Sequence, residues 1–168
     1  MHLIRQLLSF LPGVLLVAIT ACDGAGPLFP ELRGPPASVT IGGITYSAFT
    51  APTPGLPSSV KVTVQAENRG SVIRRADLRG GNCRILLRGY SRAERVGGLV
   101  FDQTRDAVCE DIALSLEVPP SESRRIAVTP DLLRLTDRHF PVRLFLSAVI
   151  EIESTRLEIA AGEVLLTP

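Results

Sequence analysis

The sequence is poor in the residue types on which most enzymes and nucleic-acid-binding proteins depend. Its 168 residues include no tryptophan, two histidines and three cysteines, and only 5% are aromatic. The formal net charge is +1, whereas a dedicated nucleic-acid binder is normally strongly basic. We therefore expect no nucleic-acid partner. Hydrophobic residues make up 45% of the chain, which is enough for the core of one ordinary domain and argues against a wholly disordered chain.

The first 21 residues have the layout of a secretory signal peptide. Arg5 supplies one positive charge, and an apolar run with two interruptions, Pro12 and Gly13, follows from residue 6 to residue 21. This run is short for a membrane-spanning helix, which needs about 20 apolar residues. The sequence thus predicts export, with residues 1–21 removed.

The residues at the end of this run, Ile19-Thr20-Ala21-Cys22, resemble the lipobox of bacterial lipoproteins. The resemblance implies that Cys22 is lipidated, that the mature chain begins there, and that acyl chains anchor the protein to a membrane of the cell envelope. It would face the extracytoplasmic space, on either the inner or the outer membrane. The alternative is an ordinary secreted protein in which Cys22 has no such role.

Two cysteines remain once Cys22 is assigned to the anchor. An exported protein meets an oxidising compartment, so Cys83 and Cys109 are expected to form a disulfide. Residues 22–36 are rich in proline and glycine and read as a linker, which leaves residues 37–168 as one domain. A zinc site needs more ligands than these two cysteines and one histidine supply, so we expect no metal and no cofactor.

The predicted domain consists of short stretches in which apolar and polar residues alternate. Val60, Val62, Val64 and Ala66 form one such row, and residues 142–152 form the longest, with apolar residues on both faces. Such rows, separated by Gly, Pro and Asn turns, predict an all-β fold. We expect an antiparallel immunoglobulin-like β-sandwich with one short helix, which would begin after Thr129, and a bulge at Gly162.

Three features also resemble the bacterial intracellular proteinase inhibitor family. They are the strand and turn from Val60 to Asn68, the proline loop from Pro119 to Ser123, and the long strands at the end of the chain. The resemblance implies an interaction or inhibitor module, although no inhibitory residue can be carried over from the family.

Candidate catalytic chemistry is sparse. His139, the only histidine after the signal, lies near Asp137 but without a nucleophile motif. Four carboxylates between residues 102 and 111 could bind calcium or form a hydrolase pair, although their spacing matches no calcium loop. We expect no enzyme activity; an enzyme site near His139 or within Asp102–Asp111 stays open as an alternative. The four carboxylates are those of Asp102, Asp106, Glu110 and Asp111.

Seven arginines fall between Arg74 and Arg95, and alternation predicts that Arg84 and Arg88 share one strand face. Guanidinium groups bind phosphates and carboxylates well, so a lipid, polyanion or other ligand could bind at Arg84 and Arg88. The alternative is that the arginines pair with the acidic loop at residues 102–111, which the disulfide would bring near.

The sequence favours a non-enzymatic envelope lipoprotein that binds a protein partner through loops or a strand edge. The segments of interest are Gly89–Asp106 and the proline-rich loop at residues 52–57. The identity of the partner does not follow from the sequence.

Overall fold

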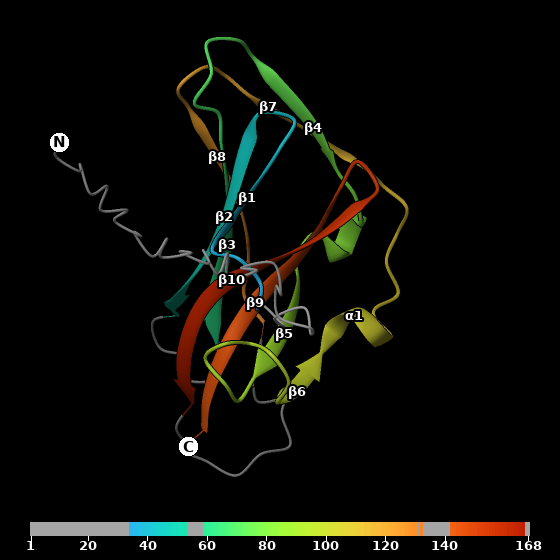
Figure 1. Ribbon diagram of the computed structural model, residues 1–168. Helices are drawn as coiled ribbons and strands as arrows, with labels where there is room; N and C mark the ends of the chain where they lie inside the picture. The colour runs from blue at the N-terminus through green and yellow to red at the C-terminus, as the bar shows by residue number, and fades with distance from the viewer. Residues whose placement is uncertain (1–33, 54–58, 131, 133–141, 167–168) are drawn as a thin grey trace, which may run out of the picture. The chain divides into compact units, whose positions relative to one another are not determined.

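Ten antiparallel strands arranged in two sheets make up the part of the chain that the structure describes, residues 34–53, 59–130, 132 and 142–166 of a computed structural model (Figure 1). These residues belong to one compact unit, Leu32–Pro168. The sheets pack face to face, because one cluster of buried side chains takes members from both of them. The all-β sandwich predicted from the alternation is confirmed.

The smaller sheet has the strand order β1-β2-β3-β8. Its strands are β1 (Ser38–Ile41), β2 (Ile44–Pro52), β3 (Val60–Glu67) and β8 (Ser123–Val128). The inward row of β3, from Val60 to Ala66, is buried as the sequence predicts, and it faces the core with Ile44 and Tyr46 of β2. Alternate residues therefore point outward from the core.

The larger sheet is built around β9. Its strands are β4 (Arg74–Leu78), β5 (Leu86–Tyr90), β6 (Leu99–Asp102), β7 (Leu114–Val118), β9 (Val142–Ile152) and β10 (Thr155–Leu166). The order is β6-β5-β9-β4-β7, and β10 pairs with β9 along the whole length of β9. Figure 1 shows this long hairpin in orange and red, with β5 beside it. The apolar residues on both faces of β9 correctly predicted a central strand.

The short helix lies elsewhere than predicted. The helix α1 is a single turn, Gln103–Asp106, in which the Asp102 side chain accepts a hydrogen bond from the Thr104 amide. Four residues are too few to show helical periodicity, so the sequence pattern does not reveal this turn. The helix predicted after Thr129 falls mostly outside the described residues, of which Leu132 is fully buried.

Asn68 ties the two sheets together at a predicted turn. Its buried side-chain amide donates to the carbonyl oxygens of Val72 and Val118, at 2.8 and 2.9 Å. Its Oδ1 accepts a hydrogen bond from the Gly70 amide. One side chain thus links the end of β3 to the residues before β4 and to the end of β7. Such full pairing is what burial of an amide requires.

Cys83 and Cys109 form a disulfide, in agreement with the pairing expected from the sequence. Their Cα atoms lie 5.4 Å apart, and 26 positions separate them in the chain. The bond joins a 3₁₀ turn, η1 (Gly81–Cys83), to the segment between α1 and β7. It therefore closes the part of the chain that holds β5, β6 and α1.

We predict that the double variant Cys83→Ser, Cys109→Ser unfolds more easily. Opening a loop of this length should lower the unfolding free energy by roughly 3–4 kcal/mol, because the unfolded chain regains conformational entropy. Denaturant unfolding of oxidised wild type and variant measures the difference. Equal midpoints would show that the disulfide contributes no stability.

Candidate functional site

A polar network crosses the outer face of the larger sheet. The Arg88 guanidinium on β5 contacts Glu158 on β10, and its Nε lies 3.1 Å from an Asp102 carboxylate oxygen. The Tyr90 hydroxyl donates to the same Glu158 carboxylate at 2.6 Å. Thr104 donates to Asp102 from both its amide and its hydroxyl and accepts from Arg88. Four segments, β10, β5, β6 and α1, are thereby held together.

The network shifts the ionisation of its members. Burial of Asp102 by itself raises its pKa, but hydrogen bonds from Thr104 and Arg88 outweigh that effect, so the pKa lies below its usual value. Burial of Arg88 by itself lowers its pKa, and the two carboxylates reverse the direction. Burial and the hydrogen bond to Glu158 raise the pKa of Tyr90 to about 12. Asp102 and Arg88 are thus stabilised in their charged forms, and Tyr90 is stabilised as the neutral phenol.

Arg95 forms hydrogen bonds at the β-bulge between β9 and β10. Gly162, with φ of 115°, follows a register shift in the pairing, which is the bulge predicted at this position. The Arg95 guanidinium donates to the carbonyl oxygens of Leu146 and Gly162, at 3.1 and 2.9 Å. It also lies 5.9 Å from the centre of the Phe145 ring. Arg95 therefore fixes the β5–β6 loop onto this face, and burial lowers its pKa.

Arg84 and Arg88 do not share a strand face, contrary to the prediction. Arg84 caps the turn η1 in a helical conformation, and β5 begins only at Leu86. The turn starts at Gly80 and Gly81, whose positive φ angles interrupt the alternation. Arg88 already contacts two carboxylates, whereas no carboxylate of the described residues forms an ion pair with Arg84, whose Nε is buried.

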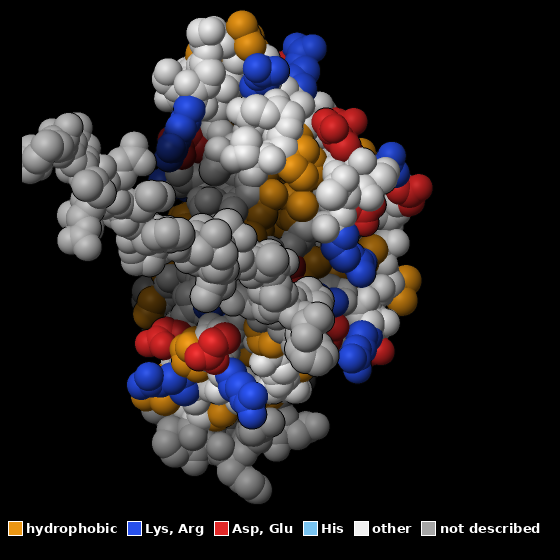
Figure 2. All heavy atoms as spheres, in the orientation of Figure 1, with side chains coloured by type: hydrophobic (Ala, Val, Ile, Leu, Met, Phe, Trp, Pro, Cys, Tyr) orange, Lys and Arg blue, Asp and Glu red, His pale blue; other side chains and the backbone are white. Residues whose placement is uncertain are grey.

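Two arginines of the cluster pair with the acidic loop, as the alternative drawn from the sequence expects. Arg88 pairs with Asp102, and Arg79 lies 3.2 Å from Asp111. On the face of the molecule that Figure 2 shows, basic and acidic side chains are interspersed rather than gathered into one positive area. Arg75, Arg79 and Arg88 are thus compensated close by, whereas among the described residues no carboxylate forms an ion pair with Arg74, Arg84, Arg92 or Arg95.

The carboxylates of the acidic loop do not converge on a metal. The Asp102 side chain is 6% exposed and faces Arg88, whereas that of Asp111 is 89% exposed. Within the described ranges, no group of three or more His, Cys, Asp or Glu side chains is arranged to hold a metal ion. His139 and residues 54–58 of the proline-rich loop lie outside the described residues.

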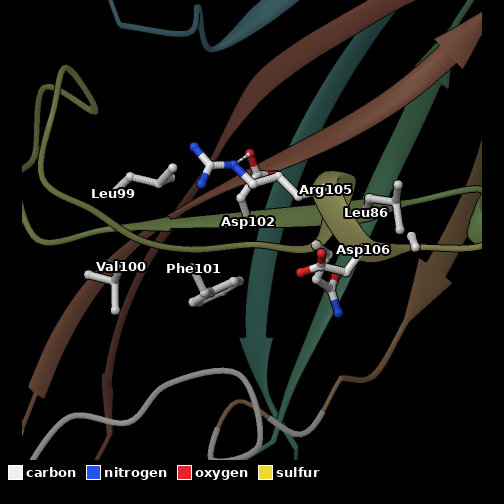
Figure 3. A pocket seen from close by; sticks show the side chains of 9 residues that line it. Leu86, Leu99, Val100, Phe101, Asp102, Arg105 and Asp106 are labelled. Atoms are coloured by element: carbon white, nitrogen blue, oxygen red, sulfur yellow. Dashed lines mark ion pairs between the residues drawn. The ribbon is translucent and has the colours of Figure 1, made fainter.

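A hollow of about 560 Å³ lies over β6 and α1, within the Gly89–Asp106 segment noted from the sequence (Figure 3). Phe101 and Val100 form much of its apolar wall, and Arg105 reaches toward Asp102 on the other side of β6. The Phe101 ring packs directly over Gly89, so closely that a Cβ atom there would overlap it. The ring position thus depends on the glycine.

A second hollow, of about 390 Å³, lies beside the edge of β8. One wall is the strand from Ile126 to Val128, and the other is η1 with Arg84 and Glu110. Asn82 shapes this wall, because its Oδ1 accepts from the Glu110 amide and its Nδ2 donates to the Val108 carbonyl. Sequence reasoning missed this site, since no local pattern shows that β8 approaches the disulfide.

Comparison with known proteins identifies no relative of established function. No protein-family model matches the chain, and no curated protein matches it. The chain is similar to a structural genomics target designated SoR45, with 9% identity, a TM-score of 0.30, and coverage of 77% of this chain and 89% of the other. It is also similar to the putative ApaA protein from Bordetella pertussis, with 15% identity, a TM-score of 0.31, and coverage of 80% and 96%. Such scores identify neither family nor function.

We predict that stability falls in alkali because both tyrosines are buried as neutral phenols. Burial, and secondarily Glu153, raises the pKa of Tyr46 to about 12, as burial and Glu158 do for Tyr90. A raised pKa in the folded state contributes stability that is complete below the ordinary value of 10.0 and is lost as the pH rises toward about 12.

Denaturant unfolding at several pH values, with ultraviolet titration of the phenols, measures this loss. The single variants Tyr46→Phe and Tyr90→Phe should each make the decline less steep. Tyrosines that titrate near the ordinary pKa in the folded protein would contradict the prediction.

Proposed function

We propose that this protein is a lipid-anchored lipoprotein of the bacterial cell envelope whose β-sandwich binds, without catalysis, an extended acidic segment of another envelope protein. The observation that carries the proposal is the regular edge of β8 beside the second hollow. The anchor is supported by the likeness of Ile19-Thr20-Ala21-Cys22 to a lipobox. Among the described residues, no helix is long and apolar enough to cross a membrane.

The edge of β8 suits the addition of a strand. Its six residues pair with β3 in register without interruption, and no strand of the described chain pairs with its other edge. Alternate residues of such a ladder point their amide and carbonyl groups away from the neighbouring strand, where they can pair with an added one. Proteins normally protect regular edges of this kind, and the protection that β8 carries, Arg124 and Arg125, is charge that an acidic strand would neutralise.

Other edges of the sandwich are less suitable. The strand β6 has four residues, and its pairing with β5 is irregular between Gly89 and Tyr90. The amide of Ala160 on β10 already donates to the carbonyl of Pro36, so the segment before β1 covers part of that edge. β8 is therefore a better acceptor for an added strand than β6 or β10.

The hollow beside β8 would receive side chains of the added strand. Ile126 and Val128 are half-buried and give it an apolar floor, while Arg84 and Glu110 stand on the opposite wall. Strand addition obtains affinity from backbone hydrogen bonds and specificity from such side-chain pockets. An extended segment with apolar residues at alternate positions fits this arrangement.

The charged residues at this edge are two bases, Arg84 and Arg124, and two acids, Glu110 and Glu122, and an acidic segment would use the two bases. Arg124 shares the β8 face of Ile126 and Val128, and the buried Nε of Arg84 has no hydrogen-bond partner among the described residues. Glu122 compensates Arg124 only through an exposed ion pair, which contributes little free energy. A carboxylate that displaced this pair and reached Arg84 would gain charge-assisted hydrogen bonds.

Polyanion binding, the alternative drawn from the arginine cluster, has less support. Arg75, Arg79 and Arg88 each pair with a carboxylate of this chain, at Glu117, Asp111 and Asp102 respectively. A long polyanion would have to break several of these pairs at once. A short acidic segment at β8 breaks only the one exposed ion pair between Arg124 and Glu122.

We predict that Cys22 carries the anchor. In cells grown with a palmitate analogue, the wild-type protein should be labelled, and mass spectrometry should find an acylated N-terminal peptide that begins at Cys22. The variant Cys22→Ser should be unlabelled and keep residues 1–21, whereas the control Cys83→Ser should still be labelled. An unlabelled wild-type chain that retains Met1 would contradict the anchor.

We predict that β8 accepts an acidic strand. Full-length protein in phosphatidylcholine nanodiscs is mixed with a fluorescent eight-residue peptide of alternating valine and glutamate, and binding is followed by anisotropy. The control peptide replaces each glutamate with lysine. The acidic peptide should bind about tenfold more tightly, since its carboxylates can pair with Arg84 and Arg124.

Two proline variants test the edge itself. Neighbouring residues of a strand point their amides to opposite edges, so of Ile126→Pro and Ala127→Pro one disrupts the pairing with β3 and the other removes only an outward donor. Thermal unfolding identifies the variant that leaves the pairing intact. That stable variant should lose peptide binding; if it binds as wild type does, strand addition at β8 is wrong.

A further inference from the structure

The outer face of the smaller sheet carries a second candidate binding surface. In the register of its four strands, the outward residues alternate with the buried row that includes Ile44, Val62 and Val64. Phe49, which is 41% exposed, is the one large apolar side chain among them. The others are small, hydroxylated or charged: Ser38, Thr40, Thr45, Ser47, Ala51, Lys61, Thr63, Gln65, Glu67, Ser123, Arg125 and Ala127.

Phe49 borders a shallow hollow of about 320 Å³ on this face. Ala51, Thr63 and Ala127 contribute small side chains, and Lys61 and Arg125 are the charged residues of its lining. Thr63 points outward, yet it is only 5% exposed because it lies between these longer side chains. The hollow therefore combines an apolar surface with two positive charges, and no acid lines it.

Arg125 is held in place before any ligand arrives. Its Nε donates to the Gln65 side-chain oxygen at 2.9 Å, and its guanidinium carbon lies 5.9 Å from the centre of the Phe49 ring. Both contacts restrict the side chain, and the ring contact is a cation–π interaction. In the described part of the chain, no carboxylate forms an ion pair with Arg125 or with Lys61. Arg125 and Lys61 therefore differ from Arg75 and Arg88 of the larger sheet, each of which pairs with a carboxylate.

We infer that this hollow binds an oxyanion attached to a flat apolar group, either a carboxylate or a phosphate ester. The guanidinium of Arg125 would pair with the oxyanion, with Lys61 as a second cation, and the apolar group would pack on Phe49. The volume is at the lower end of the range for small-molecule sites, which is about 300–1,000 Å³. A ligand of one or two fused rings matches it.

This site is separate from the strand-binding edge proposed above. The two hollows share only Ala127 among their lining residues, and they lie on different sides of β8. Arg84 and Arg124 belong to the edge, whereas Arg125 and Phe49 belong to the outer face. Either site can therefore fail in experiment without affecting the other.

The test compares three probes that differ in charge. Full-length protein in phosphatidylcholine nanodiscs is titrated with naphthalene-2-carboxylate, 2-naphthyl phosphate and the neutral naphthalene-2-carboxamide, and empty nanodiscs give the lipid background. We expect at least one anion to bind about tenfold more tightly than the amide, because a charge-assisted hydrogen bond contributes on that order. The tighter of the two anions identifies the ligand class.

Variants locate the binding. Arg125→Gln and Phe49→Ala should each weaken the better anion about tenfold, and Arg125→Gln should leave the amide unaffected. The matched control Arg143→Gln changes an exposed arginine on β9, whose nearest carboxylate is that of Glu163, and should bind as wild type does. Thermal unfolding confirms that each variant is folded.

Four outcomes would overturn the inference. The first three are the absence of binding by either anion, equal binding of the anions and the amide, and undiminished anion binding by a folded Arg125→Gln protein. Loss of binding in Arg143→Gln to the same extent as in Arg125→Gln would also overturn it, since the effect would then reflect net charge rather than the hollow.

Discussion

The burial of β9 on both of its faces is the constraint on which the rest of the sandwich depends. Its inward residues, among them Leu144 and Ile150, form the core with the smaller sheet. Its outward residues Ser147 and Val149 are buried as well, at 0% and 2% exposure. A strand buried in this way needs partners on both edges and cover on its outer face. The strands β10, β5 and β4 pair with its edges, and the polar network and the loop that holds Arg95 cover its outer face.

Polar side chains cover the outer face of β9, and because they are partly buried they form the polar network. Arg88, Tyr90 and Glu158 come from strands that flank β9, and Asp102 comes from the strand beyond. Partly buried charges are costly unless each is paired, so the carboxylates and guanidinium must satisfy one another. This explains why Arg88, although it belongs to an arginine-rich segment, offers no free charge to a ligand.

The sequence predicts much of this fold because most strands bury one face. The strands Val60–Glu67 and Val142–Ile152 lie where the rows of apolar residues predict them, and the bulge at Gly162 and the disulfide follow from single residue types. The alternation fails at Arg84, where two glycines with positive φ introduce a turn. It also does not show which strands become neighbours. Contacts such as Arg95 with the Gly162 carbonyl, 67 residues apart, arise only from that topology.

The two hollows of the smaller sheet were inaccessible to sequence reasoning for the same reason. Phe49, Lys61 and Arg125 lie on three different strands. Arg84 lies between η1 and β5, a connection of the larger sheet, and lines the hollow beside β8. Their chemistry nevertheless differs from that of the larger sheet in one consistent way. There, cations such as Arg88 meet carboxylates of the chain itself, and the result is rigidity.

Around β8, Arg124 also meets a carboxylate, that of Glu122, but two other arginines do not. In the described part of the chain, the buried Nε of Arg84 has no hydrogen-bond partner, and Arg125 contacts an amide and an aromatic ring. A protein gains no stability by leaving cations beside apolar hollows and a strand edge open to pairing. The larger sheet therefore provides the rigid support, and the β8 side of the smaller sheet is the surface on which we propose that acidic ligands bind.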